Sequence, residues 1–296
     1  MYTGIRHLGR RGVVESKHRE RKGKKMVTIK QENFSIEQIC NSGQCFRMKE
    51  IGEGSYEVIA FGKYLEVTQK GDEITFSCTK EEFESIWRSY FDLDTCYGTW
   101  IESIDENDEY LRRASQFGNG IRILRQDVWE MIISFIISQQ NNIKRIRKCI
   151  ETICEKYGEQ KVNAQGKMYY DFPTVEALAR VSEEELRNCN LGYRSKYIVK
   201  TSHAILNGEV DLERLKHMEF QDAKEELLKL TGIGVKVADC ICLFGLHHLD
   251  GFPVDTHIKQ VFEKQYAHGF PFEKYKGYAG VLQQYIFYYD LLGHTK

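Results

Sequence analysis

The chain has 296 residues, of which 42% are hydrophobic and 12% aromatic, so it is long enough for two or three packed subdomains with cores of their own. Its formal net charge of −1 excludes attraction of nucleic acid through an overall basic field, and any binding to a polyanion must be local. The most apolar segment, residues 131–138, is too short to cross a bilayer, and the N-terminus lacks the apolar core of a signal peptide, so we expect no membrane association.

The first 25 residues differ from the rest of the chain in charge. They hold nine Lys and Arg against Glu15 and Glu20, a local charge of +7 that leaves −8 for the remainder. We predict that this basic leader is disordered. One interpretation is an arm that binds DNA. The other is an upstream extension or a misplaced start, because Met26 directly precedes strand-like sequence.

From Met26 to about Cys78 the pattern is that of short strands rich in β-branched and aromatic residues. Gly43 and Gln44 lie at the start of this region, where the pair alone would indicate only a turn. The expected strands are residues 56–61, 64–67 and 74–76, separated by turns at 62–63 and 70–72. They predict a small twisted antiparallel sheet.

Beyond Thr79 the pattern becomes helical. Asp127 is a suitable N-cap for residues 128–137, which are apolar on most faces and therefore predict a buried central helix. This helix ends at five polar residues, 138–142, before the next helix resumes at Ile143. A polar cluster between two apolar helices is costly to bury, so it is interpreted either as a hydrated loop or as part of a site.

Two further features carry polar or aromatic groups beside helices. Ser182 opens a capping box, and its helix stops just before Tyr193 and Arg194, a pair that suits either base stacking with phosphate contact or ordinary surface packing. A C-terminal helix is expected over about residues 275–292. It places Gln283 and Phe287 on one face, as a hydrogen-bonding edge beside a stacking surface or as core with a stray amide.

The stretch around two closely spaced glycines has the strongest local signal. A short helix is expected over residues 221–230, and a second helix begins at about Val235 or Lys236. Between them Gly232 and Gly234 form a tight hairpin, because glycine tolerates positive φ. The unpaired N–H groups at the start of the second helix carry the positive end of its dipole, which favours an anion such as phosphate.

A lysine at this helix start makes the stretch chemically interesting. The helix dipole destabilises the ammonium form of Lys236, and desolvation by apolar neighbours would favour the neutral, nucleophilic amine. Asp255 follows after a short link and could stabilise positive charge or move protons. Each residue also has a simpler interpretation, since Lys236 could be solvated and Asp255 could be only an N-cap. Their combination with the glycine hairpin favours the catalytic interpretation.

These residues resemble the helix–hairpin–helix DNA glycosylases that carry a Gly/Pro…Asp element, and most closely the 8-oxoguanine DNA glycosylase/lyase branch. The resemblance covers nearly the whole chain from about residue 30. It implies that Lys236 is the nucleophile that displaces the damaged base and forms a Schiff base with the sugar, and that Asp255 is its carboxylate partner. No cysteine follows Cys242, so the iron–sulfur loop of some relatives is absent, and we expect no metal and no cofactor.

The resemblance also implies a pocket for the flipped base. The carbonyl of Gly43 would accept a hydrogen from N7 of 8-oxoguanine, which is protonated only in the oxidised base. Cys240 and Phe287 would form the two sides of a sandwich, and Gln283 would read the Watson–Crick edge. Contacts with the DNA backbone and with the opposite cytosine would come from Gly232, Gly234, Val237, His257, Gln140, Asn142, Arg145, Tyr193 and Arg194.

Two positions depart from that branch. The branch has a run of three asparagines, whereas this chain has Gln139-Gln140-Asn141-Asn142, so Gln140 replaces the asparagine that would fill the vacated site. Discrimination of the opposite base is therefore less tightly specified. Thr231 stands where proline is usual before the hairpin, which we expect to reduce rigidity rather than function.

The sequence predicts an α+β fold in which a small N-terminal antiparallel β domain precedes a mostly α-helical body of two subdomains. The expected divisions are a leader at 1–25, the β-rich domain with linking helices at 26–120 and the glycosylase body at 121–296, with its helix–hairpin–helix at about 221–245. The predicted function is excision of 8-oxoguanine from double-stranded DNA, opposite cytosine, followed by β-elimination. We expect a monomer, in the cytoplasm of a bacterium or the nucleus of a eukaryote.

Two other functions stay open. One is a monofunctional alkylpurine glycosylase, although such relatives keep the aspartate and lack the lysine. The other is a helix–hairpin–helix module that binds DNA without catalysis, against which Asp255 and the dispersed pocket residues argue.

Overall fold

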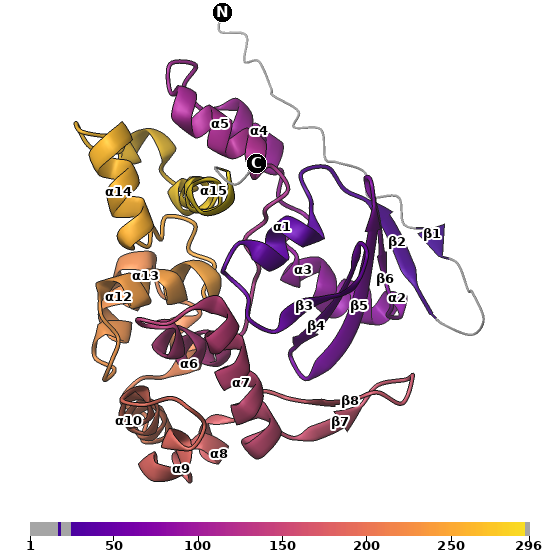
Figure 1. Cartoon of the computed structure of the whole chain (residues 1–296), viewed down its shortest axis with the longest axis vertical. Coiled ribbons are helices and arrows are strands. Elements are labelled where there is room, and N and C mark those ends of the chain that lie inside the picture. The colour runs from indigo at the N-terminus through magenta and orange to yellow at the C-terminus, as the bar shows by residue number, and fades with distance from the viewer. Residues whose placement is uncertain (1–16, 19–24, 294–296) are drawn as a thin grey trace, which may run out of the picture.

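The computed structural model describes residues 17–18 and 25–293 (Figure 1). The predicted leader therefore lies outside the described residues, apart from Lys17, His18 and Lys25. Lys17–His18 form the short strand β1, which pairs with Val27 and Thr28, so the sheet extends into the segment that we expected to be disordered. Within the described part of the chain, no helix combines the length and apolarity needed to cross a bilayer.

The N-terminal part is a six-stranded sheet in which every neighbouring pair is antiparallel (Figure 1). Its order is β1-β2-β6-β5-β4-β3. The alternation of side chains along a strand explains its packing, since Leu65 and Val67 on β5 are fully buried. The remaining strands are β2 (Val27–Lys30), β3 (Met48–Gly52), β4 (Ser55–Ala60), β5 (Lys63–Lys70) and β6 (Glu73–Phe76).

The rest of the chain is mainly helical, which confirms the predicted α+β class. A β-hairpin that the sequence pattern did not predict, β7 (Gln160–Val162) with β8 (Met168–Tyr170), projects beside the sheet (Figure 1). The first helices are α1 (Ile36–Asn41), α2 (Lys80–Glu82), a π-helical turn (Phe83–Trp87), α3 (Arg88–Tyr90), α4 (Tyr97–Glu102) and α5 (Glu109–Phe117). They are followed by α6 (Val128–Ser138), α7 (Ile143–Tyr157), α8 (Val175–Ala179), α9 (Glu183–Arg187), α10 (Arg194–Leu206), α11 (Leu212–Leu215), α12 (Phe220–Leu228), α13 (Val235–Phe244), α14 (Thr256–Gln265), a 3₁₀ turn (Phe272–Tyr275) and α15 (Ala279–Leu292).

Helix α6 is the buried central helix that its apolar sequence predicts. Every residue from Val128 to Ile137 is buried, and the Asp127 side chain caps the helix by accepting a hydrogen bond from the Glu130 amide. It packs against α7, α10 and α13. Since α13 carries the lysine, this packing sets one wall of the site described below.

The described residues form two hydrophobic cores. The smaller core joins residues of the sheet and of segments up to Leu93 with Leu124, and the larger core contains the helical body. Helices α4 and α5, which we assigned to the N-terminal domain, contribute Tyr97 and Leu111 to the larger core. The division at residue 120 remains a prediction, and the packing favours an earlier boundary.

The two parts are joined behind Gly43 by buried hydrogen bonds. The Gln44 side chain donates to the Arg122 carbonyl at 2.9 Å and accepts from the Leu124 amide at 2.8 Å. Arg122 itself is fully buried, and its guanidinium donates to the carbonyls of Phe91 and Asn33, among others. Buried donors satisfied in this way hold the turn that carries Gly43 in a defined position.

The C-terminal helix begins later than predicted. Gly277 has φ +93° and ends the 3₁₀ turn at Phe272–Tyr275, so α15 starts only at Ala279. Gln283 and Phe287 nevertheless lie one turn apart on this helix, as expected.

Candidate active site

The predicted helix–hairpin–helix is formed by α12 and α13. Gly232 has φ +88°, and a Cβ atom there would lie 2.5 Å from Cγ of Tyr197, so both the backbone and the packing require glycine. Gly234 is the N-cap residue of α13 at an ordinary φ of −97°, and a Cβ atom there would meet nothing within 4 Å. The first N–H groups of α13 therefore begin beside an open, exposed glycine, where a phosphate could approach closely.

Lys236 lies in the first turn of α13 and is half-buried. Its Nζ atom is 5.8 Å from the centre of the Phe135 ring, which belongs to the central helix α6. One side of the amine thus faces an aromatic surface rather than water. Lys236 therefore lies in the first turn of α13 with its amine beside this ring.

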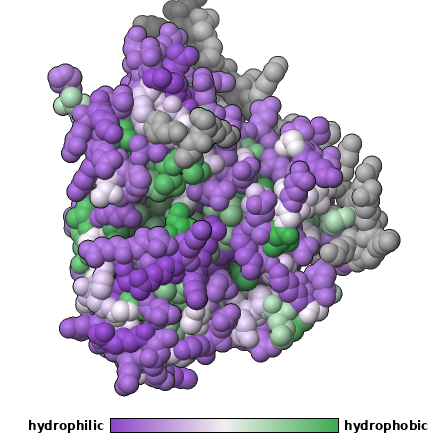
Figure 2. All heavy atoms as spheres, in the orientation of Figure 1, coloured by the Kyte–Doolittle hydropathy of each residue, from purple (hydrophilic) through white to green (hydrophobic). Residues whose placement is uncertain are grey.

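Lys236 and the predicted base-pocket residues meet in one pocket although they are distant in sequence. They come from the turn after α1, from α13, from the segment before α14 and from α15. Figure 2 shows hydrophobic surface in a hollow near the middle of this face of the molecule, surrounded by hydrophilic residues. The pocket is lined by Ser42, Gly43, Phe135, Lys236, Cys240, Phe244, Pro253, Asp255, Gln283, Gln284 and Phe287.

Asp255 both caps a helix and lines the pocket, so it fits both interpretations that we considered. Its Oδ1 accepts a hydrogen bond from the Ile258 amide at 2.9 Å, so it caps α14, and the same residue lines the pocket with Lys236. Capping occupies one carboxylate oxygen and leaves the other for a second partner. The cap fixes the orientation of the carboxylate, so structure and chemistry can share this residue.

Cys240 lies one helical turn after Lys236 and is 2% exposed. Burial raises the pKa of its thiol to about 11, although the charge of Lys236 and a hydrogen bond from it oppose that shift. The thiol is therefore protonated at neutral pH, and a thiol is a poor nucleophile compared with a thiolate. Cys240 thus suits the wall of a base pocket better than a second nucleophile.

The pocket is narrow in this structure. Its volume of about 50 Å³ corresponds to one or two water molecules and is too small for a purine. Phe287 narrows it, since a Cβ atom on Gly43 would lie 3.3 Å from Cε1 of that ring. The ring of Phe287 also packs edge-on against His257, whose Nδ1 is 2.8 Å from Oδ2 of Asp290. A base can enter only if Phe287 moves away from Gly43.

The polar loop between α6 and α7 contacts Arg194 of α10. Arg194 is 4% exposed, and its guanidinium donates to the carbonyls of Gln139 and Gln140. Gln140 itself is exposed with φ +49°. Asn142 caps α7 by accepting from the Arg145 amide at 3.0 Å. In this structure the buried guanidinium of Arg194 therefore fixes the loop through its backbone carbonyls. The contact of Arg194 with the opposite base remains a prediction.

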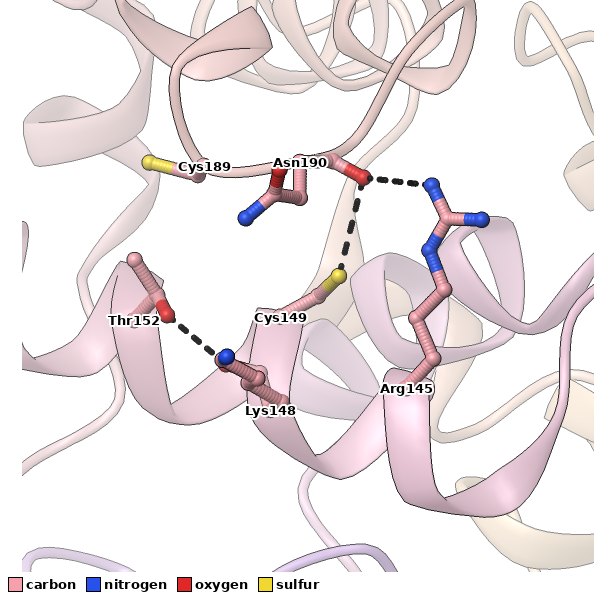
Figure 3. A pocket seen from close by; sticks show the side chains of 6 residues that line it. All are labelled: Arg145, Lys148, Cys149, Thr152, Cys189 and Asn190. Atoms are coloured by element: carbon pink, nitrogen blue, oxygen red, sulfur yellow. Dashed lines mark hydrogen bonds between the residues drawn. The ribbon is translucent and has the colours of Figure 1, made fainter.

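Arg145 borders a cavity of about 290 Å³ between α7 and the turn after α9 (Figure 3). Its Nη2 donates to the Asn190 carbonyl at 3.2 Å, and Cys149 Sγ points to the same oxygen at 3.8 Å. Tyr193 is 41% exposed next to this turn, with the Arg194 guanidinium over its ring. The predicted opposite-strand residues thus gather on one side of the molecule.

The family models match nearly all of the described chain. Residues 26–132 match the family described as 8-oxoguanine DNA glycosylase, N-terminal domain, and residues 133–271 match the HhH-GPD superfamily of base excision DNA repair proteins. The chain belongs to the 8-oxoguanine DNA glycosylase family of the HhH-GPD superfamily. The resemblance predicted from the sequence is confirmed.

Solved structures support the same relationship. The apo form of the Clostridium acetobutylicum 8-oxoguanine glycosylase/lyase is 39% identical, with a TM-score of 0.86 over 94% of this chain and 99% of that chain. The complex of that protein with double-stranded DNA containing cytosine opposite 8-oxoguanine has a TM-score of 0.87 at 38% identity, over 95% of this chain and 98% of that one.

Among curated proteins, the N-glycosylase/DNA lyase of Saccharomyces cerevisiae is 37% identical over 60% of this chain. The N-glycosylase/DNA lyase of Arabidopsis thaliana is 32% identical over 74% of this chain. The matched regions span 50% and 63% of these two relatives, respectively.

One residue that links the parts of this family site was not singled out from the sequence. Gln139 Nε2 donates to the Gly232 carbonyl at 2.9 Å, and the backbone carbonyl of Gln139 accepts a hydrogen bond from the Arg194 guanidinium. Gln139 therefore ties the polar loop to the hairpin between α12 and α13. The available signal was the polar run itself, which could not tell which glutamine turns inward. Gln140 has a positive φ, and this turn of the backbone sends the side chains of Gln139 and Gln140 in different directions.

Proposed function

We propose that this protein is a bifunctional DNA glycosylase that excises 8-oxoguanine opposite cytosine from double-stranded DNA and then cleaves the abasic strand. The observation that carries the proposal is the shared pocket: a lysine at a helix N-terminus, a capping carboxylate, a glycine carbonyl and a buried glutamine meet there from four separate segments. A module that only binds DNA has no need of such a pocket.

Binding begins at the hairpin and the polar loop. The N–H groups at the start of α13 hold a backbone phosphate, and the duplex bends so that the damaged nucleotide leaves the stack. Unstacking costs a few kcal/mol, which contacts to the bent DNA offset. The protein acts as a monomer, with Gln140 and Asn142 near the vacated position and Tyr193 available to wedge the opposite strand.

Base removal uses the amine of Lys236. Its lone pair attacks C1′ while the C1′–N9 bond breaks, and the base leaves with the electron pair and is protonated. Asp255 stabilises the positive charge that develops on the sugar. Loss of a proton from the amine and opening of the sugar ring then give a Schiff base between Lys236 and C1′.

The Schiff base makes strand cleavage possible. It acidifies the C2′ hydrogen, and removal of that proton expels the 3′ phosphate by β-elimination. Hydrolysis of the unsaturated product restores Lys236. A monofunctional glycosylase would need only the carboxylate and an activated water, so the position of Lys236 in the pocket favours the bifunctional function.

Selection of the oxidised base rests on Gly43. N7 of 8-oxoguanine carries a hydrogen that the Gly43 carbonyl accepts, whereas N7 of guanine is itself an acceptor and would leave two lone pairs opposed. Phe287 and Cys240 close on the two faces of the base.

The test is excision from duplexes that carry 8-oxoguanine opposite each of the four bases, with release of the base and strand cleavage measured separately. We expect both products, with the fastest reaction opposite cytosine. Base release without cleavage would identify a monofunctional enzyme. If neither product forms, the protein acts on another lesion or only binds DNA.

Replacing Gly43 with alanine should weaken selection against guanine. The residue has φ +78°, which costs an L-residue about 1–2 kcal/mol, and its new Cβ would press on Phe287. The displaced carbonyl would read N7 less well, so the ratio of 8-oxoguanine to guanine excision should fall about tenfold. Gly71→Ala is the matched control, because Gly71 has φ +60° with no atom near its Cβ position. An unchanged ratio in Gly43→Ala would remove this carbonyl from recognition.

A further inference from the structure

Two consecutive glutamines of α15 line the base pocket. Gln283 and Gln284 are each 3% exposed, and both belong to the pocket that contains Lys236 and Asp255. The family resemblance assigns a role to Gln283 alone. Gln284 has no assigned function, and burial of a second amide at this position is costly unless its hydrogen bonds are made.

Hydrogen bonding determines which way the Gln283 amide faces. Gln283 Nε2 donates to the Pro253 carbonyl at 3.0 Å, and a carbonyl can only accept. The NH₂ group of Gln283 must therefore face Pro253, which turns its Oε1 towards Gln284. Gln284 Nε2 donates to that Oε1 at 3.0 Å. The three groups form a chain with a single direction.

One buried polar atom in this series of hydrogen bonds has no partner. Gln284 Oε1 is buried and has no hydrogen-bond partner among the described residues. An unpaired buried acceptor destabilises the folded state, so an apolar side chain would stabilise the fold better at this position. Stability alone therefore does not explain a glutamine here.

We propose that Gln284 is a positioning residue that holds the Gln283 amide in one orientation for reading the flipped base. An unrestrained amide can rotate and exchange its donor and acceptor positions. With Gln284 and Pro253 in place, Gln283 offers one remaining lone pair and one remaining N–H from fixed positions. This preorganisation lowers the cost of recognising the donor and acceptor edge of a guanine-type base. The inference rests on the function proposed above.

Replacement of Gln284 by leucine tests the inference, because leucine keeps much of the volume and removes the hydrogen bond. Single-turnover excision of 8-oxoguanine should fall about tenfold, the effect of losing one hydrogen bond of about 1 kcal/mol or slightly more. Cleavage at a preformed abasic site should stay within about twofold of the wild type, because no base is read in that step.

Tyr285→Phe is the matched control. It removes a buried hydroxyl that has no hydrogen-bond partner among the described residues, at the neighbouring position of the same helix and outside the pocket lining. It should leave both rates unchanged. Equal excision by wild type and Gln284→Leu would overturn the inference about Gln284 and leave the proposed function standing. Equal losses in both reactions would also overturn it, by showing a general structural defect. A wild type that excises no 8-oxoguanine would overturn both proposals.

Replacement of Gln284 by glutamate adds a readout that a structural role would not change. The neutral acid can donate its O–H to Gln283 Oε1, whereas the carboxylate cannot donate and repels that oxygen. Excision by Gln284→Glu, relative to wild type at the same pH, should therefore rise as the pH is lowered. A ratio that does not depend on pH would contradict the positioning role.

Discussion

Replacing Lys236 with glutamine should abolish covalent trapping by borohydride on duplex DNA that contains 8-oxoguanine. Glutamine keeps a polar side chain of similar length but has no amine to form a Schiff base, so no adduct can be reduced. Base excision should fall at least about a thousandfold, as expected for loss of a nucleophile. DNA binding, measured by fluorescence anisotropy, should change little because the hairpin glycines and the helix N-terminus remain.

The matched control is Lys229→Gln on the same helix–hairpin–helix. Lys229 is exposed and pairs with Glu226 outside the pocket, so its replacement should leave trapping at the wild-type level. Trapping that persists in Lys236→Gln would show that another amine is the nucleophile.

Asp255→Asn should slow turnover by about a hundredfold or more, a typical effect for loss of a catalytic carboxylate. Asparagine caps helices about as well as aspartate, so α14 should keep its start and the melting temperature should change by only a few degrees. Stability and activity are thereby separated in one variant. Single-turnover excision and thermal unfolding are the two measurements.

Asp127→Asn supplies the comparison, because Asp127 caps α6 in the same way and does not line the pocket. Asp127→Asn should change neither the rate of single-turnover excision nor the melting temperature appreciably. Near-normal turnover in Asp255→Asn would reduce Asp255 to a helix cap and would require another group to stabilise the charge on the sugar.

Local patterns predicted the parts of this site that depend on neighbouring residues in the chain. The spacing of Gly232 and Gly234 predicted the hairpin and the start of α13, because backbone conformation at glycine is a local property. Asp127 and Ser182 were recognised as N-caps for the same reason, and both cap as expected. The family resemblance then related Gly43 to the distant α15, which no local pattern could do.

The features that the sequence did not predict depend on contacts between distant segments. Gln283 and Gln284 are adjacent amides, and only the Pro253 carbonyl distinguishes their orientations. The carbonyls of the polar loop bind the guanidinium of Arg194, a contact that no local pattern predicts, and the DNA contact that the resemblance implies for Arg194 stays a prediction. The narrowness of the pocket likewise results from Phe287 packing on Gly43 across the fold.

The most direct test of the central claim is peptide mapping of the borohydride-reduced adduct formed by the wild-type protein with 8-oxoguanine DNA. Mass spectrometry of the digested adduct identifies the modified residue without relying on a substitution. We expect the reduced sugar to be attached to Lys236, which lies at the start of α13 and lines the pocket. Attachment to another lysine or to the N-terminal amine would contradict it.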